Sequence, residues 1–322
     1  MLLLRSHRLG ANTGVTTMTQ VDRHKFTSSI GAPGAARAAG HTVVMGLLES
    51  RPLVQVMFLS RFLAGAALTG QARAHLAAVA VGAVAWSSAA VAVYIFNGVM
   101  DVAEDRGNGS HRPIASGRLP RSSAAALAGG TAALALGAGA VAGIEVEVLI
   151  FLGLGFVYSG PPFPAKRQGM AASVVVAGLG LLTFLGGMGA AQGFSAAAVV
   201  FGLVMSGWMG LVGALAKDLT DVPGDAVAGR RTFAVRHGVG PVARYTAVLA
   251  VGVAATGLTA AALAAPILLP SMLVLTAAAF RLAVDCRSLT GNALAQPYRS
   301  FMAGQYGAVA ALGLSLVARN TF

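Results

Sequence analysis

Two short acidic stretches hold most of the side chains in this chain that could bind a metal ion or a charged substrate. They cover residues 97–105 and 217–225 and contain six of the 11 Asp and Glu residues. Each lies at the end of a long apolar run. Carboxylates at the edge of a membrane add nothing to stability, and ionisable residues at membrane depth are functional candidates. We therefore interpret both stretches as binding sites.

The spacing within each stretch suits oxygen ligands on one face of a helix, where side chains four apart lie together. The first stretch presents Asn97, Asp101 and Asp105. The second presents Asp218, Asp221 and Asp225. Such clusters without Cys or His favour Mg²⁺, which takes one or two carboxylates and completes its octahedron with water and phosphate oxygens. The alternative is a pair of solvated helix ends, which two spaced triplets disfavour.

Basic residues accompany both acidic stretches. The candidates for phosphate contact are Arg112, Lys166, Arg230 and Arg231. Arginine forks match phosphate oxygens, and lysine supplies a point charge. Contact with lipid headgroups is the alternative for each cation taken singly. Acid clusters together with cations predict a Mg²⁺-diphosphate site at the cytoplasmic mouth of an apolar cavity.

Composition indicates a membrane protein. The chain has 322 residues, is 56% hydrophobic and 11% charged, and has a mean hydropathy of +0.73, whereas soluble domains carry about 25% charged residues. The net charge of +12 does not indicate nucleic acid, because the basic residues fall mainly between apolar runs, as the positive-inside rule predicts. We expect the lipid bilayer as a partner and no obligatory protein partner. The single cysteine, Cys286, excludes an intrachain disulfide and a cysteine-rich metal site.

Nine apolar runs have lengths that suit helices crossing about 30 Å of hydrocarbon. They cover residues 50–70, 76–100, 122–143, 146–160, 171–192, 194–216, 241–264, 266–285 and 299–318. We therefore predict an all-α polytopic membrane protein with about nine transmembrane helices. Residues 1–44 are predicted to form a disordered basic cytoplasmic tail, and residues 45–322 a single transmembrane domain.

Charge placement predicts the orientation. With nine spans and the N-terminus inside, most of the 23 Lys and Arg residues fall in cytoplasmic segments. Both acidic stretches then face the cytoplasm, in a multi-pass protein of the plasma membrane. Asp101 and Asp221 are 120 residues apart, as are Asp105 and Asp225. A duplicated helix pair would bring both stretches to one cavity. Two chance acidic loops are the alternative.

Three ordered motifs between about residue 45 and the C-terminus resemble the UbiA superfamily of intramembrane prenyltransferases. The first motif is Asn97-x3-Asp101-x3-Asp105, continued by Arg112-Pro113-Ile114-Ala115-Ser116-Gly117. The second is Asp218-x2-Asp221-x3-Asp225, followed by Gly229 and Thr232-Phe233-Ala234-Val235-Arg236-His237-Gly238. Tyr158-Ser159, Pro161-Pro162 and Lys166 resemble the tyrosine-proline loop of the family, and Arg51-Pro52 its first-helix entrance. Gly98, Val99 and Met100 depart from the polar and aromatic residues common in the first motif.

The resemblance implies nine transmembrane helices around a central cavity, and Mg²⁺-dependent transfer of a prenyl group from an isoprenoid diphosphate to a lipophilic aromatic or quinonoid acceptor. The residues implied as Mg²⁺ ligands are Asn97, Asp101, Asp105, Asp218, Asp221 and Asp225, and four of them, Asp101, Asp105, Asp221 and Asp225, are expected to be catalytic. The cations implied to bind diphosphate are Arg112, Lys166, Arg230 and Arg231.

Two further residues have competing interpretations. Tyr158 is expected either to stabilise an allylic cation through its ring face, to orient the acceptor, or simply to pack in the core. Arg61, inside the first span, is expected to meet an anionic acceptor, to snorkel towards the interface, or to pair with another helix.

Competing functions remain open on the sequence alone. A membrane terpene cyclase of the UbiA type would use the same site without an acceptor. A secondary transporter also has many helices and acidic residues, but its carboxylates usually lie near the bilayer midplane. Hydrolase motifs such as Gly-x-Ser-x-Gly and His-Glu-x-x-His are absent from the sequence.

Overall fold

Helices form all the regular elements in the part of the chain that the computed structural model describes, residues 33–107, 109–287, 289 and 291–321. The all-α prediction is confirmed for these residues. Long apolar segments form helices because a helix satisfies its own backbone hydrogen bonds, which water cannot do inside a bilayer. Residues 1–32, most of the predicted tail, lie outside the described residues, whereas residues 33–44, which we also expected in the tail, belong to a helix.

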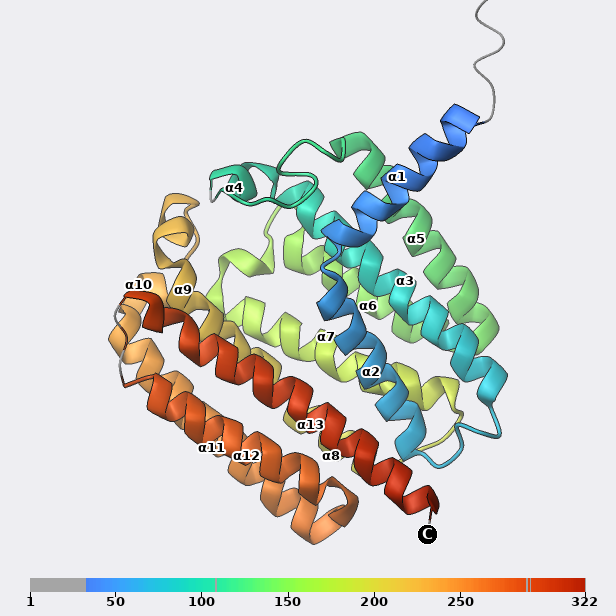
Figure 1. Cartoon of the computed structure of the whole chain (residues 1–322), viewed down its shortest axis with the longest axis vertical. Coiled ribbons are helices and arrows are strands. Elements are labelled where there is room, and N and C mark those ends of the chain that lie inside the picture. The colour runs from blue at the N-terminus through green and yellow to red at the C-terminus, as the bar shows by residue number, and fades with distance from the viewer. Residues whose placement is uncertain (1–32, 108, 288, 290, 322) are drawn as a thin grey trace, which may run out of the picture. The chain divides into compact units, whose positions relative to one another are not determined.

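The order of the helices along the chain is shown by colour in Figure 1. The longer helices are α1 Pro33–Glu49, α2 Pro52–Leu68, α3 Leu76–Met100, α5 Arg121–Ala142, α6 Glu145–Ser159, α7 Gly169–Ala190, α8 Ala196–Gly207, α9 Ala214–Val227, α11 Val239–Ala264, α12 Leu269–Asp285 and α13 Gln296–Thr321. The short ones are α4 Val102–Gly107, η1 Ala165–Arg167, η2 Trp208–Gly213, α10 Phe233–His237, η3 Pro266–Leu268 and η4 Gly291–Ala295.

The residues of each of the nine predicted apolar runs form a helix. Seven helical segments are long and apolar enough to cross a membrane, or eight if Arg37–Glu49 and Pro52–Leu68 together form one span. The 15-residue helix α6 extends only about 22 Å, less than the roughly 30 Å of a hydrocarbon core. The chain is therefore multi-pass, and the exact count of nine stays a prediction.

The sixth predicted run is longer than expected. Helix α8 continues through η2, a π-helical segment, into α9, so that Ala196–Val227 forms one helical segment. The helix therefore continues beyond residue 216, where the predicted apolar run ends. The second acidic stretch consequently lies on the helix itself, which fixes the direction of its carboxylates relative to the apolar part.

Glycines allow helices α2 and α7 to approach closely. A Cβ atom on Gly187 would collide with the carbonyl oxygen of Phe62, and one on Gly65 with the carbonyl oxygen of Phe184. Gly186 makes room in the same way for the buried ring of Trp86. Small residues are the usual means by which membrane helices pack.

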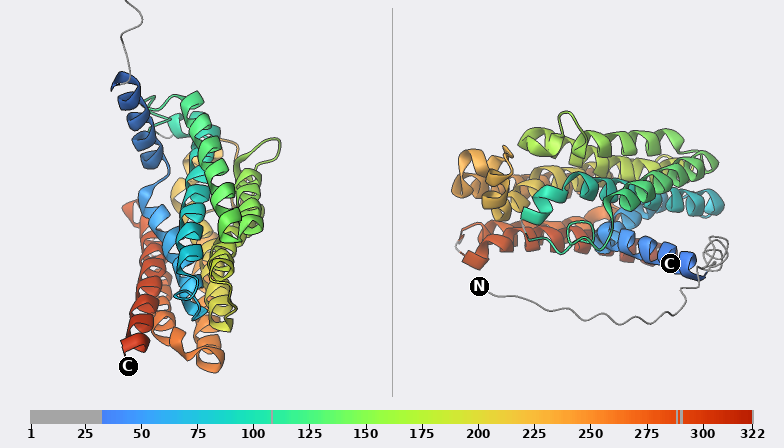
Figure 2. Two further views of the ribbon diagram at one scale, coloured as in Figure 1. Left: turned by 90° about the vertical axis from the view of Figure 1, so that its right-hand side faces the viewer. Right: turned by 90° about the horizontal axis from the view of Figure 1, so that it is seen from above.

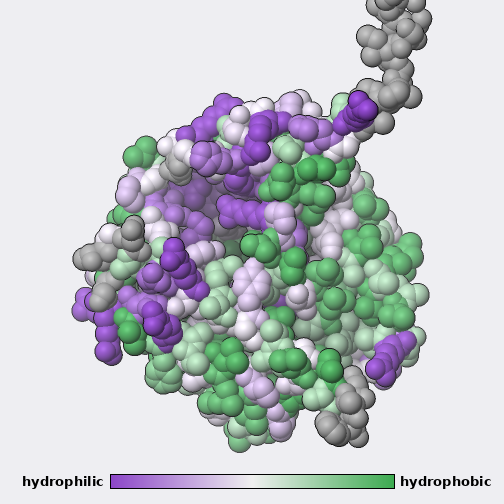
Figure 3. Space-filling model, in the orientation of Figure 1, coloured by the Kyte–Doolittle hydropathy of each residue, from purple (hydrophilic) through white to green (hydrophobic). Residues whose placement is uncertain are grey.

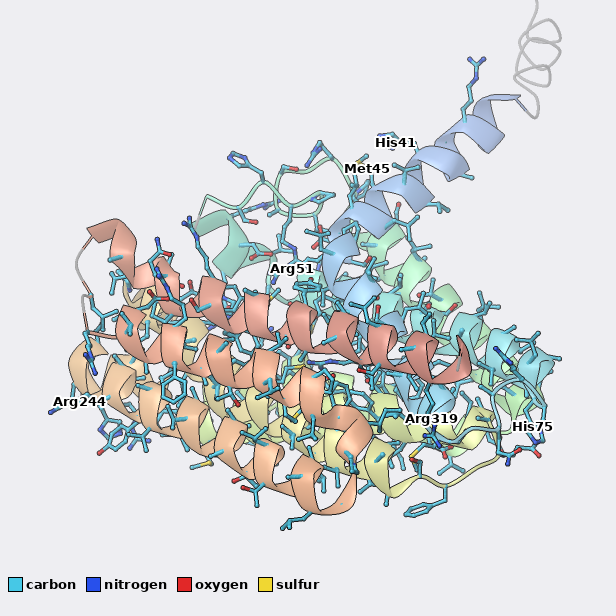
Figure 4. All side chains as sticks on the ribbon, turned by 60° about the horizontal axis from the view of Figure 1, so that its bottom comes forward. His41, Met45, Arg51, His75, Arg244 and Arg319 are labelled. Carbon is cyan, nitrogen blue, oxygen red and sulfur yellow. The ribbon has the colours of Figure 1, made fainter. Side chains whose placement is uncertain are left out.

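The arrangement of the helices places the loops at two ends. Helices α11, α12 and α13 pack together along one side, and α3 packs against α5 and α6 on another (Figures 1 and 2). Arg244 lies at the opposite end of the helices from His75 and Arg319 (Figure 4). The predicted orientation puts Arg244 on the cytoplasmic side and the other two outside, which is consistent with this separation.

Candidate active site

Both acidic stretches line one cavity of about 330 Å³. All six predicted oxygen ligands contribute to its wall, namely Asn97, Asp101, Asp105, Asp218, Asp221 and Asp225. Figure 3 shows a hydrophilic hollow bordered by apolar surface in this part of the molecule. The prediction that the two stretches share one chamber is therefore confirmed.

The first stretch retains helical spacing although α3 ends within it, at Met100. Asp101 caps α3, its backbone N–H donates to the carbonyl oxygen of Asn97 at 3.0 Å, and the N–H of Asp105 donates to Asp101 at 2.8 Å. The three side chains therefore remain on one face. The amide nitrogen of Asn97 donates to Ser159 Oγ at 2.7 Å, which leaves the amide oxygen as the atom that a metal ion would take.

Four of the carboxylates pair with cations, of which only Lys166 is distant in the chain from its partner. Asp101 pairs with Lys166, Asp105 with Arg112 at 2.9 Å, Asp221 with Lys217, and Asp225 with Arg230 at 3.5 Å. Buried charges need such partners, because removing a charge from water costs several kcal/mol. Among the described residues, no three His, Cys, Asp or Glu side chains lie close enough together to hold a metal ion by themselves.

The Asp101–Lys166 pair is the most buried of these, with 7% and 6% of the two residues exposed. Burial raises the pKa of the Asp101 carboxyl, and the neighbouring Lys166 ammonium partly opposes that shift. Burial lowers the pKa of Lys166, and Asp101 in turn opposes this change. Each charge is thus retained chiefly because the other is beside it.

Glu104 belongs to the site although we did not predict it as a site residue. It accepts a hydrogen bond from Arg230, pairs with Arg167 at 3.4 Å, and lines the cavity. Burial alone would raise the pKa of its carboxyl, but the hydrogen bond and charge of Arg230 lower it overall. Its position three residues after Asp101, which places both on one helical face, was the signal that could have found it.

A second unpredicted acid, Glu49, positions Arg112. Glu49 is completely buried, pairs with Arg112 Nη2 at 2.7 Å and accepts a hydrogen bond from the backbone of Ile114 at 3.0 Å. A Cβ atom on Gly98 would collide with the Glu49 carboxylate. Gly98, a departure from the usual first motif, therefore provides the space in which Glu49 holds Arg112 towards Asp105.

Donor atoms for an anion remain available in this wall. The Nε atoms of Arg112 and Arg230 are buried and have no hydrogen-bond partner among the described residues, and both arginines line the cavity. An unsatisfied buried donor costs about 1–3 kcal/mol, and a polyanion such as diphosphate would satisfy it. Lys166 also lines the cavity, so three of the four predicted phosphate-binding cations come together.

The fourth predicted cation, Arg231, does not join them. Its side chain is exposed and absent from the cavity wall. Its backbone pairs with the segment before α7, donating to Arg167 at 3.0 Å and accepting from Gly169 at 3.4 Å. The assignment of Arg231 to diphosphate is therefore not supported, because consecutive residues of extended backbone point in opposite directions.

The two residues with open interpretations both line the cavity. Tyr158 is partly buried on α6 near its C-terminal end. Arg61 is 1% exposed and contacts Met209 Sδ and Gln305 Oε1, the latter at 2.7 Å. The snorkelling interpretation of Arg61 was therefore wrong, because its guanidinium is inside the protein rather than at the interface.

The model of the UbiA prenyltransferase family matches residues 58–306 of this chain. The chain belongs to this family. The match includes both acidic stretches, Lys166 and the arginines around them. No curated protein sequence matches the chain.

Solved structures with the UbiA fold resemble the chain over most of its length. Digeranylgeranylglyceryl phosphate synthase is 14% identical and has a TM-score of 0.64, with 86% of this chain and 99% of that chain covered. A UbiA homologue from Archaeoglobus fulgidus bound to DMAPP and Mg²⁺ is 17% identical, with a TM-score of 0.63 and coverage of 84% and 99%. The apo UbiA homologue from Aeropyrum pernix K1 is 17% identical, with a TM-score of 0.65 and coverage of 84% and 98%. At these identities the likeness establishes the shared fold.

Proposed function

We propose that this UbiA family member transfers a prenyl group, inside the membrane, from an isoprenoid diphosphate to an aromatic or quinonoid acceptor. One observation carries the proposal: one cavity is charged at one end, where both acidic stretches meet the buried Lys166 and the half-buried Arg112 and Arg230, and apolar over much of the remainder. A prenyl diphosphate has the same two parts, a polyanionic head and a hydrocarbon tail.

The donor set at the charged end fits Mg²⁺. Its six predicted oxygen ligands are Asn97 and the five aspartates of the two stretches. They line one cavity, and Mg²⁺ takes one or two carboxylates and completes its coordination with water and phosphate oxygens. A UbiA homologue of the same fold, from Archaeoglobus fulgidus, was solved with Mg²⁺ and a prenyl diphosphate in two structures, one with DMAPP and one with GPP. Bound there, Mg²⁺ would act as a Lewis acid that neutralises charge on the departing diphosphate.

The cations of the site have a defined role in this proposal. Lys166, Arg112 and Arg230 now neutralise Asp101, Asp105 and Asp225. With substrate present, the same cations would donate to phosphate oxygens, where developing negative charge favours bond cleavage. Glu104 and Glu49 would keep Arg230 and Arg112 directed into the cavity.

The apolar wall would hold the prenyl chain and exclude water. It includes Phe58 on α2, Val93 on α3, Phe151 on α6, and Val176 and Leu179 on α7. In the proposed reaction the allylic C1–O bond breaks and its electron pair leaves with diphosphate. The acceptor carbon supplies the pair for a new C–C bond and then loses its proton. Exclusion of water prevents hydrolysis of the allylic cation.

The proposal includes the orientation predicted by charge: a multi-pass protein of the plasma membrane with the N-terminus and the acidic stretches on the cytoplasmic side. Single cysteines in a Cys286→Ser background would test it. A membrane-impermeant maleimide applied to intact cells should label Arg73→Cys and should not label Arg118→Cys. The reverse pattern would contradict the orientation.

The decisive test of the reaction is mass spectrometry of products made by the purified protein. The assay combines Mg²⁺, C10 to C20 prenyl diphosphates and a panel of phenolic and quinone precursors. A prenylated acceptor with equimolar diphosphate supports the transferase. A cyclic hydrocarbon formed without acceptor would instead establish a terpene cyclase, and accumulation of unaltered substrate in liposomes would indicate transport.

A further inference from the structure

The second half of α1, residues 42–49, has one face against the protein and one face outside. On the inner face, Met45 packs in an apolar cluster that includes Ile95 and Leu127, and a Cβ atom on Gly46 would collide with Leu127. The outer face carries large apolar side chains that are each about half exposed, namely Val43 (46%), Val44 (52%), Leu47 (49%) and Leu48 (47%). A contiguous apolar patch of this kind marks a surface that something outside the protein covers.

The lipid of the bilayer fits this face. The chain is multi-pass, and at the break between α1 and α2 the helix axis turns by 73°. Since α2 is the first predicted span, this turn directs the second half of α1 close to the plane of the membrane. The exposed Leu53 and Val56 continue the apolar surface onto α2. Helices with one apolar face lie in the interface, with that face about 5–10 Å into the boundary between headgroups and acyl chains.

The inner end of the same helix holds a cation of the candidate active site. Glu49, the last residue of α1, is completely buried. Its carboxylate pairs with Arg112 Nη2 at 2.7 Å, and its backbone carbonyl oxygen accepts from the same nitrogen at 3.2 Å. Arg112 Nη1 pairs with Asp105 at 2.9 Å. The side chain and the backbone of one α1 residue therefore both fix this guanidinium at the cavity wall.

The outer face and Glu49 belong to the same two turns of helix. Gly46 and Glu49 are three residues apart and share the inner face, so a rotation or tilt that moves the outer side chains also moves Glu49. A helix in a protein is held mainly by what its faces pack against, and the outer face of residues 42–49 leaves much of that packing to its surroundings. The contact with lipid and the position of Arg112 are thus linked through one helix.

We propose that residues 42–49 form an interfacial anchor, whose outer face lies among the lipids beside the charged end of the cavity, and that this anchor sets the position of Arg112. Glu49 is a positioning residue, because it acts on the donor only through Arg112. The effect on the donor rests on the proposed function, whereas the location of the anchor does not.

The location is tested with Leu47→Trp in the full chain. The variant is reconstituted in phosphatidylcholine vesicles whose acyl chains are brominated either near the headgroup or near the chain end, because bromine quenches tryptophan fluorescence on contact. The two native tryptophans, Trp86 and Trp208, are completely buried, so the unmodified protein provides the baseline. We expect the added emission to be quenched most by bromine near the headgroup.

The other results of the quenching experiment would each overturn the proposal. Stronger quenching near the chain ends would place residue 47 deep in the bilayer. Emission that is red-shifted and not quenched would place it in water. Emission that is blue-shifted and not quenched would place it against another protein surface, such as a second copy of this chain.

The link to Arg112 is tested with Val44→Asp and Leu47→Asp combined, in nanodiscs that contain phosphatidylglycerol. Two carboxylates on the outer face should move the anchor away from the apolar and negatively charged interface. Titration calorimetry with Mg²⁺ and a non-reactive prenyl thiolodiphosphate should then show a dissociation constant raised by roughly 10-fold, the value of one charged hydrogen bond. Val44→Ile with Leu47→Ile is the matched control and should leave this constant unchanged.

Arg112→Met separates positioning from general damage. In this background the two aspartates should cause no further loss of affinity, because the residue through which they act is missing. An equal loss in both backgrounds, or no loss in the wild-type background, would overturn the link. Should the aspartate variant not fold, Val44→Asn with Leu47→Asn enters the same cycle and should show a smaller loss. Failure of wild type to bind the thiolodiphosphate would instead refute the proposed function, and the quenching result would stand.

Discussion

The guanidinium of Arg230 donates a hydrogen bond to the carboxylate of Glu104, although 126 residues separate the two in the chain. Arg230 also pairs with Asp225 at 3.5 Å and approaches Asp101 at 4.0 Å. One side chain therefore links the first acidic stretch to the second. This link allows carboxylates of both stretches to line the same cavity, because Arg230 neutralises charges that would otherwise repel one another.

Replacement of Arg230 by methionine should weaken binding of a prenyl thiolodiphosphate by at least roughly 10-fold, the value of one charged hydrogen bond. The adjacent Arg231→Met is the matched control, because that side chain is exposed and lies outside the cavity wall. It should change the dissociation constant by less than about two-fold, since exposed charges contribute little. Equal losses in both variants would contradict the assignment of Arg230.

Asp101→Asn and Asp225→Asn should each reduce Mg²⁺-dependent release of diphosphate by roughly 100-fold or more, because each removes charge from the proposed metal site while keeping the side-chain shape. Glu145→Gln, at the start of α6 and outside the cavity wall, serves as the control and should retain activity. Membrane insertion should be the same in all three. Full activity in either aspartate variant would refute its role as a ligand.

Lys166→Met should destabilise the protein more than the double change Lys166→Met with Asp101→Asn. The single change leaves the Asp101 carboxylate buried and unpaired, whereas the double change removes both charges. Unfolding temperatures in detergent would measure the difference. The opposite order would show that Lys166 does not neutralise Asp101.

The same pair predicts a dependence on pH. Lys166 holds down the pKa of Asp101, which burial already raises, so loss of Lys166 raises this pKa further. A carboxyl with a raised pKa in the folded state favours folding when protonated. The unfolding temperature of Lys166→Met should therefore approach that of the double variant as the pH is lowered through the pKa of Asp101. A difference in unfolding temperature that does not change with pH would show that the unpaired Asp101 carboxylate is not its cause.

Gly187→Ala should destabilise the protein by about 1–3 kcal/mol, the usual cost of overpacking, because the added methyl group would meet the backbone of α2 at Phe62. Gly129→Ala is the control, since a Cβ atom there meets nothing within 4 Å. It should be neutral or slightly stabilising, as alanine favours a helix over glycine. Thermal unfolding of the two purified variants would compare them.

The sequence by itself determined the helices and the faces that carry the chemistry. Apolar runs of membrane length predicted where helices lie, and the four-residue spacing of Asn97, Asp101 and Asp105 predicted a single polar face, because both are local properties of helical geometry. The family motifs were likewise visible in the sequence. The run 146–160 likewise predicted α6, which covers Glu145–Ser159. Hydropathy alone did not mark the end of the second acidic helix at Val227, because that end lies in a polar stretch.

Only the tertiary structure decided which charges meet. Local spacing says nothing about partners that are distant in the chain, so the pairing of Asp101 with Lys166 and of Glu104 with Arg230 had to come from packing. Arg230 and Arg231 are equivalent in the sequence, yet only Arg230 faces the cavity. The burial of Arg61 without a counter-charge is likewise a property of the packed helices, since it depends on what α13 and η2 place beside it.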